Sequence, residues 1–247
     1  MNSTQTQFLR NAVQAVYNSL MKLGHQANAR KCEETAKQAV MAAIMSVQSA
    51  GTDPGQHNRA NKAMIVAADQ AARSRGAACK AGCSHCCKSE EISISVYEAR
   101  TIKENFDGLS DATKQAVMAN ARSYKSTGLP SRKERSPCVF LVDEKCSIHE
   151  FRPSMCWAYL SLNERLCAAR LLNGQGAVLT VEYAHALYVA FNFCYLPVTS
   201  GDAKLRGCQF EMNSTMRFLL CEGGQVEDLP PGDGQKSAKV IPINLLN

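Results

Sequence analysis

The sequence predicts a mainly α-helical protein, in which a helical scaffold surrounds a cysteine-rich metal-binding centre with a short β-hairpin. Apolar residues recur every three or four positions through most of the first third, which is the period of a helix. The 247 residues are 45% hydrophobic and 20% charged, an ordinary balance for a folded globular chain. Twelve residues are cysteine, and four of these fall between positions 79 and 87. We therefore expect an N-terminal helical region over 1–75, a cysteine-cluster domain over 76–172, and a C-terminal helical region with an irregular tail over 173–247.

Three helices are expected in the N-terminal region. Thr4 and Gln7 have the spacing of a capping box, and Gly24 is a natural helix stop. A second helix is expected over about residues 28 to 49, before a turn at residues 53 to 55, and a third from about residue 60 to Gly76. The apolar faces of these helices are Leu9, Val13, Val16, Leu20 and Leu23; Ala36, Val40, Ala43 and Val47; and Ala60, Met64, Ala67 and Ala71. They predict a packed scaffold, with a partner-binding surface as the alternative.

Further elements follow from caps and turns. Ser95 and Glu98 form a second capping box, which predicts a helix to about Phe106, and Ser110 is expected to cap a helix that ends near residue 126. Residues 138 to 149 contain two short runs around a polar turn, the pattern of a small β-hairpin. Pro153 suits the first position of a helical turn. Helices are also expected over 179–193 and 212–221, before an irregular tail from Leu229.

The cysteine run consists of Cys79, Cys83, Cys86 and Cys87. A closed tetrahedral metal site needs ligands that converge, and short gaps within a turn bring thiolates together. Buried free thiols are the alternative, because cysteine also packs as a small hydrophobic residue. Cys86 and Cys87 are adjacent, so their side chains point in different directions. We therefore expect them to serve two sites, or two atoms of one multinuclear cluster.

These cysteines and the residues downstream resemble the YkgJ-type CxxCxxCC cysteine-cluster family, a zinc- or iron-chelating domain. The resemblance rests on the run from Cys79 to Cys87, on Pro137-Cys138, on the segment from Cys146 to Cys156 with its Arg152-Pro153 pair, and on Asn163-Glu164 followed by Cys167. It covers roughly residues 76 to 172. The chain departs from the family pattern in the three-residue gap after Cys79, in His149 where tyrosine is usual, and in Trp157 where arginine is common.

The resemblance implies that eight thiols bind metal. They are Cys79, Cys83, Cys86, Cys87, Cys138, Cys146, Cys156 and Cys167. Eight thiolates suffice for two sites of four, and both zinc and iron–sulfur clusters use four cysteines, so the choice between zinc and an iron–sulfur cluster stays open. Arg152 is expected to donate hydrogen bonds to thiolates or to backbone carbonyls. The remaining cysteines are interpreted as packed thiols, with Cys194 as the first candidate for an additional ligand. His85 and His149 are interpreted as hydrogen-bonding or surface residues, with metal ligation as the alternative.

Three functions are compatible with such a centre. The first is a structural or interaction module organised by zinc or an iron–sulfur cluster. The alternative is an iron–sulfur redox protein or a radical S-adenosylmethionine methylase, because the family includes relatives assigned as flagellin lysine-N-methylases and because Cys79, Cys83 and Cys86 have the spacing of such a cluster site. Metal storage or delivery is the third. No catalytic constellation is recognisable in the sequence.

Charge and composition narrow the partners and the compartment. The net charge of +6 hints at an acidic partner, but eight thiolates around two divalent zinc ions would lower it to +2. Nucleic acid is therefore an unlikely partner, and a protein partner is expected. No apolar stretch approaches the ~18 residues of a membrane span. Clustered cysteines without an export signal predict a reducing, cytoplasmic location.

Overall fold

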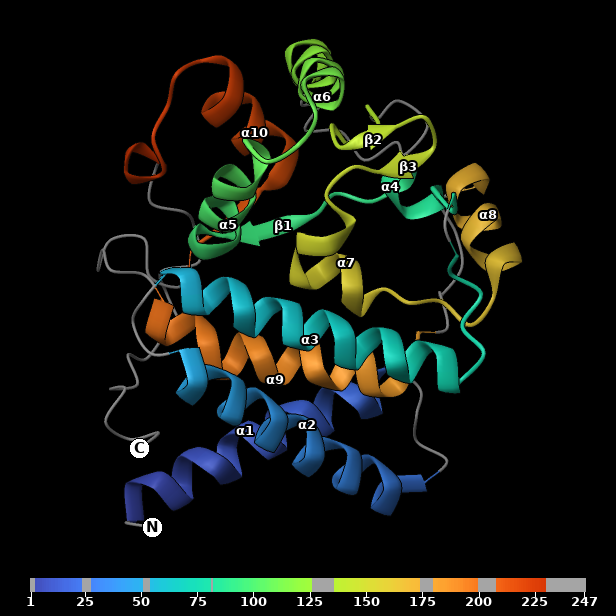
Figure 1. Cartoon of the computed structure of the whole chain (residues 1–247). Helices are drawn as coiled ribbons and strands as arrows, with labels where there is room; N and C mark the ends of the chain where they lie inside the picture. The colour runs from blue at the N-terminus through green and yellow to red at the C-terminus, as the bar shows by residue number, and fades with distance from the viewer. Residues whose placement is uncertain are drawn as a thin grey trace.

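The computed structural model describes residues 3–23, 28–50, 54–80, 82–125, 136–173, 180–199 and 208–229. Within these ranges the chain forms ten α-helices and two antiparallel sheets of two strands each, as Figure 1 shows. The predicted mainly α-helical fold is therefore confirmed. The irregular tail predicted from Leu229 and the predicted helix end at residue 126 fall almost wholly outside the described residues.

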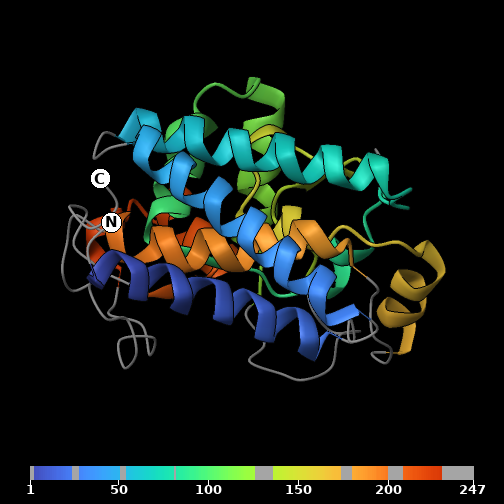
Figure 2. The same cartoon turned by 90° about the horizontal axis from the view of Figure 1, so that it is seen from below.

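Four long helices form a bundle at one side of the molecule. They are α1 (Ser3–Lys22), α2 (Ala29–Ala50), α3 (Pro54–Ser74) and α9 (Glu182–Thr199), and α9 packs against the other three (Figure 2). Their shared hydrophobic core, which we call the bundle core, contains many fully buried alanines, among them Ala12, Ala36 and Ala43. Small side chains let helix axes approach closely, so the alanine-rich faces predicted from the sequence do pack. The fourth helix of this bundle comes from the C-terminal region.

The structure corrects several details of the first three helices. Thr4 does not cap α1, because the helix already includes Ser3. Pro54 opens α3 instead of ending a turn before it, which suits a residue that lacks an N–H and has a helical φ. Ala68 and Ala72 of α3 are buried, while the predicted Ala67 and Ala71 are half-buried. Ala60 and Met64 are buried as predicted, so the buried face of α3 differs from the predicted one only in the second half of the helix.

A second hydrophobic core, which we call the upper core, lies between α5 (Val96–Phe106), α6 (Asp111–Ser123) and α10 (Met212–Cys221). The capping box of α5 is confirmed: the Ser95 hydroxyl accepts from the Glu98 N–H at 3.3 Å, and the Glu98 carboxylate accepts from the Ser95 N–H at 2.8 Å. Ser110 caps α6, as predicted. The sequence did not predict the pairing of β1 (Ser93–Ser95) with β4 (Gln209–Glu211), whose strands are only three residues long.

The cysteine-rich segment contributes to both cores, with Phe140 and Ile148 in the upper core and Trp157 in the bundle core, and most of it lies at the right of Figure 1. It comprises α4 (His85–Ser89), the predicted hairpin of β2 (Leu141–Val142) and β3 (Lys145–Cys146), a single 3-10 turn (His149–Phe151), α7 (Ser154–Ala158) and α8 (Glu164–Asn173). Pro153 directly precedes α7 and is not its first residue. Trp157 of α7 is fully buried and meets Phe191 of α9 edge-on, with ring centroids 6.1 Å apart. This contact packs the cysteine-rich segment against the bundle.

Candidate metal centre

The first two cysteines lie in the chain that leaves α3. The Ala78 N–H donates to the Ser161 carbonyl at 2.8 Å, and the Ser161 N–H donates to the Cys79 sulfur at 3.2 Å. Burial raises the pKa of Cys79 to about 11. Cys83 follows Gly82, whose φ of +84° is the left-handed conformation that glycine adopts readily. The backbone N–H of His85 donates to the Cys83 sulfur, which opposes the effect of burial on its pKa.

Cys86 and Cys87 are adjacent residues of α4. The Cys87 thiol donates to the Cys86 sulfur, and this bond lowers the pKa of Cys86 to about 7 while it raises the pKa of Cys87. Backbone N–H groups at the start of α4 also donate to Cys86 and favour its thiolate. Cys86 is solvent-exposed. The Cys87 carbonyl accepts from the Cys138 N–H at 2.7 Å, so α4 is joined directly to the segment that precedes the hairpin.

Cys138 precedes the hairpin and Cys146 is the last residue of β3, and a backbone N–H two residues further on lowers the pKa of each thiol. The donors are Phe140 and Ile148. Burial raises the pKa of Cys138 to about 12, and it raises the pKa of Cys146 as well. Cys156 lies in α7, where burial raises its pKa well above the usual value. All three sulfurs therefore stay protonated at neutral pH in the absence of a metal.

Electrostatic repulsion shows which thiols are neighbours, because the interaction between two charges weakens with distance. Charge on Cys86 and on Cys167 raises the pKa of both Cys79 and Cys83. Charge on Cys138 and on Cys156 raises the pKa of Cys87, and charge on Cys146 raises the pKa of Cys138 and of Cys156. On this basis we divide the eight sequence-predicted thiols into two candidate sets of four, and Cys86 is a neighbour of both. The α8 set contains Cys79, Cys83, Cys86 and Cys167, and the hairpin set contains Cys87, Cys138, Cys146 and Cys156.

The two sets meet at α4. Cys86 belongs to the α8 set by its effect on Cys79 and Cys83, yet charge on Cys86 also raises the pKa of the hairpin thiols. As the side chains stand, no three His, Cys, Asp or Glu residues in the described part of the chain are arranged to hold one metal ion. Cysteine thiolates are suitable ligands for zinc and for iron–sulfur clusters, and the thiols of each set lie near one another. Binding would therefore require the thiols of each set to turn toward a common centre.

A buried cation lies beside the hairpin set. Arg152 is 4% exposed and donates to the His149 carbonyl at 2.7 Å and to the Asp69 carboxylate of α3 at 2.6 Å. Its charge lowers the pKa of Cys146 and of Cys156, although the effect of burial is larger. The expectation that Arg152 donates to backbone carbonyls is confirmed. The sequence could not show that its countercharge comes from α3.

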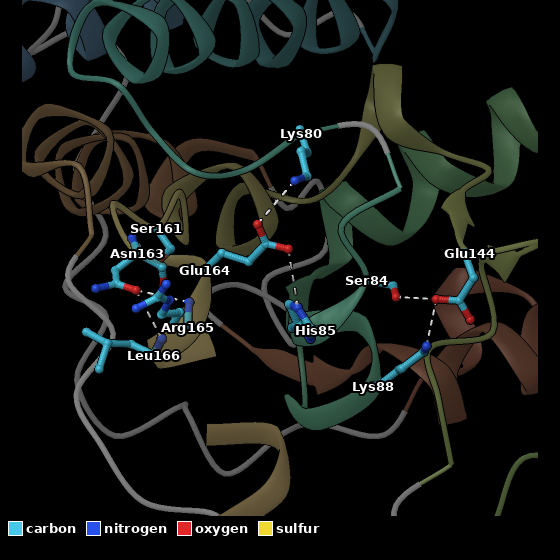
Figure 3. Close-up of polar contacts among 10 residues, drawn as sticks. All are labelled: Lys80, Ser84, His85, Lys88, Glu144, Ser161, Asn163, Glu164, Arg165 and Leu166. Carbon is cyan, nitrogen blue, oxygen red and sulfur yellow. Dashed lines mark hydrogen bonds and ion pairs between the residues drawn. The ribbon is translucent and has the colours of Figure 1, made fainter. Parts of the chain in front are cut away.

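Ion pairs lie at the protein surface around the candidate metal centre (Figure 3). Glu164 of α8 pairs with Lys80 at 3.2 Å and lies 3.8 Å from the His85 ring. Glu144, in the hairpin loop, accepts from the Ser84 hydroxyl and from Lys88. His85 therefore takes part in polar contacts at the surface, and the described structure gives it no ligand role. His149 is exposed.

Glu98 has a second role that its capping box did not reveal. Its side chain is buried, and besides capping α5 it accepts from the Ser154 N–H at 2.6 Å. Ser154 is the first residue of α7, two positions before Cys156. One carboxylate thus caps two helices and positions the helix that presents Cys156. The sequence signal for the first role was the Ser95 spacing, and nothing local to Glu98 indicated the second.

The other four cysteines lie in the hydrophobic cores. Cys32 and Cys194 are buried in the bundle core, and Cys208 is buried in the upper core. Cys221 donates to the Met118 carbonyl at 3.7 Å, and Cys32 donates to Glu182 at 3.9 Å. Burial raises the pKa of Cys194 to about 12. Cys194 therefore lies among the packed bundle helices, in a different core from the hairpin thiols.

The helical scaffold brings eight cysteines from distant parts of residues 79–167 into one region of the fold. Residues 78–171 match the family model CxxCxxCC, which is described as a putative zinc- or iron-chelating domain. All eight thiols lie within this match, which confirms the resemblance and supports metal binding by this segment. No curated protein and no solved structure matches the chain. Across the described helices, none is both long enough and apolar enough to cross a membrane.

Proposed function

We propose that the protein binds two metal centres, one through the four thiolates of the α8 set and one through the four of the hairpin set. The observation that supports this most strongly is the group of backbone N–H donors aimed at sulfur. The Ser161 N–H donates to the Cys79 sulfur at 3.2 Å, and nearby backbone N–H groups lower the pKa of Cys83, Cys138 and Cys146. A hydrogen bond to sulfur favours the thiolate, which is the form that ligates metal.

The donor sets favour a structural centre. Four protein thiolates close a tetrahedral site and leave no open position for a substrate, which is typical of zinc sites that stabilise a fold and of electron-transfer clusters. We therefore propose zinc or an iron–sulfur cluster as the resident group of a structural or interaction module. The strands of the described chain form two-stranded sheets, so no observation favours the repeating strand–helix frame of a radical methylase.

We further propose that the partner of this module is a protein. Met41 and Met45, one turn apart on α2, are 51% and 62% exposed, and Val66 of α3 is 52% exposed. Exposed apolar side chains of this kind support contact with another protein more than contact with nucleic acid. A reducing, cytoplasmic compartment remains our prediction, because free thiols at this density persist where reductants are present.

Elemental analysis of anaerobically purified protein tests the proposal. The expected result is two zinc ions per chain in colourless protein, or iron with matching sulfide in coloured protein. Cys83→Ser removes one ligand of the α8 set, and Cys146→Ser removes one of the hairpin set. Each variant should bind less metal, while the matched control Cys221→Ser should bind as much as the parent. Unchanged metal content in both variants, or freshly isolated protein that holds no metal, would contradict the proposal.

A further inference from the structure

Helix α8 is attached to the molecule in an unusual way. Of its described residues, none belongs to the bundle core or to the upper core. The helix has ten residues, and isolated helices shorter than ~12–15 residues are marginal in water. Hydrophobic burial stabilises the other long helices of this chain. Other attachments must therefore hold α8 in place.

The side chains of residues 166–171 are half-buried, and ion pairs also attach α8 to the rest of the fold. Its neighbour is the short helix α4 (Figure 1). Glu164 pairs with Lys80 and lies near His85 (Figure 3), but the side chains of Lys80 and Glu164 are 68% and 44% exposed. Ion pairs this exposed contribute little and weaken further in salt. Arg170 and Glu90 form a better sheltered pair, with nitrogen–oxygen distances of 2.7 and 3.3 Å.

Cys167 lies near the middle of α8 and is the member of the α8 set that this helix supplies. The other three members come from the chain after α3 and from α4. A metal bound by this set would thus join α8 covalently to two other segments. The metal would supply the attachment that hydrophobic packing supplies elsewhere in the fold.

The hairpin set has a different setting. Cys138, Cys146 and Cys156 all pack against the upper core. Next to them in the chain, Val139, Phe140 and Trp157 are fully buried. Arg152 and its ion pair with Asp69 add a buried countercharge from α3. The backbone around this set is therefore held by hydrophobic packing that does not depend on a metal.

We propose that the α8 set is the exchangeable centre of the two, and that α8 is a lid whose docking depends on the metal there. Withdrawal of that metal undocks α8, while the hairpin set keeps its metal and its fold. This inference rests on the proposed function, because it requires both sets to bind metal.

Titration of the metal-loaded full-length chain with EDTA tests the proposal. Bound metal is counted per chain at each step, and hydrogen exchange is followed by mass spectrometry in peptides that cover residues 164–173 and 139–158. We expect one centre to lose its metal at a lower EDTA concentration than the other. Exchange in 164–173 should rise by about tenfold or more with this first loss, while exchange in 139–158 stays unchanged until the second.

Cys167→Ser provides a second route to the same state. It should bind one centre fewer than the parent and exchange in residues 164–173 as the partly stripped protein does, while the control Cys221→Ser should match the parent. Simultaneous loss of both centres, or continued protection of 164–173 after the first loss, overturns this inference and leaves the proposed function standing. A parent protein that binds no metal overturns both. The titration needs no variant, so misfolding of Cys167→Ser does not weaken the test.

Discussion

Replacement of Glu98 with alanine should destabilise the protein more than the loss of an ordinary helix cap. The Glu98 carboxylate accepts from the Ser95 N–H and hydroxyl at 2.8 and 2.9 Å, and from the Ser154 N–H at 2.6 Å. With alanine, α5 loses half of its capping box, and the first turn of α7 loses a buried acceptor.

The size of the effect follows from these contacts. Removal of a capping side chain typically costs about 1 kcal/mol. A buried N–H left without an acceptor, such as that of Ser154, costs about 1–3 kcal/mol more. We therefore expect the free energy of unfolding to fall by about 2–4 kcal/mol. Glu98→Gln should fall between the parent and Glu98→Ala, because the amide keeps one acceptor oxygen and replaces the other with a donor.

Urea unfolding of the metal-loaded protein measures this difference, provided that the slope of free energy against urea concentration stays the same. Ser110→Ala is the matched control, because Ser110 caps α6 through one exposed contact, from the Thr113 N–H at 3.3 Å. That control should cost about 1 kcal/mol or less. If Glu98→Ala is no more destabilised than Ser110→Ala, the carboxylate does not stabilise two helices, and our reasoning about α7 is wrong.

Two further predictions concern charge. In metal-free protein at pH 7, a short pulse of iodoacetamide should label Cys86 well before Cys138, because their pKa values are about 7 and about 12. Labelling of Cys86 should slow as the pH falls below 7 and its thiolate is protonated, and equal labelling of both peptides in a mass spectrum would contradict the assignment. Asp69→Asn should lower the free energy of unfolding by about 2–4 kcal/mol, because it leaves the buried Arg152 guanidinium without a countercharge. Glu34→Gln, which breaks an exposed pair, should change it by less than about 0.5 kcal/mol, and equal effects of the two substitutions in thermal melts would refute the role of Arg152.

The adjacent cysteines of α4 lie where the two candidate thiol sets meet. Charge on Cys86 raises the pKa of thiols in both sets, whereas the pKa of Cys87 is raised by charge on Cys138 and Cys156 of the hairpin set. A metal in each set would therefore place two negatively charged centres on either side of one short helix. Arg152 lies beside the hairpin set, while Lys80 lies at the surface near the α8 set. Because the cation beside the hairpin set is buried and the cation near the α8 set is exposed, we expect the two centres to lose metal at different rates.

Local chemistry is sufficient to predict many elements of this fold. The Ser95–Glu98 box, the Ser110 cap and the two-residue hairpin loop involve groups within a few positions of one another, so the chain between them imposes their geometry. Helical periodicity likewise indicates the bundle helices, since one turn brings every third or fourth side chain to the same face. The eight candidate thiols are also evident from spacing and from the family resemblance.

Contacts between distant residues were decided by the tertiary structure. Short strands such as β1 and β4 have no recognisable pattern, and their pairing depends on how α5 and α10 share the upper core. The second acceptor role of Glu98 and the countercharge of Arg152 likewise join segments that only packing brings together. The neighbours of Cys86 and Cys87 have the same origin, because spacing along a chain does not specify which distant thiols become neighbours in space.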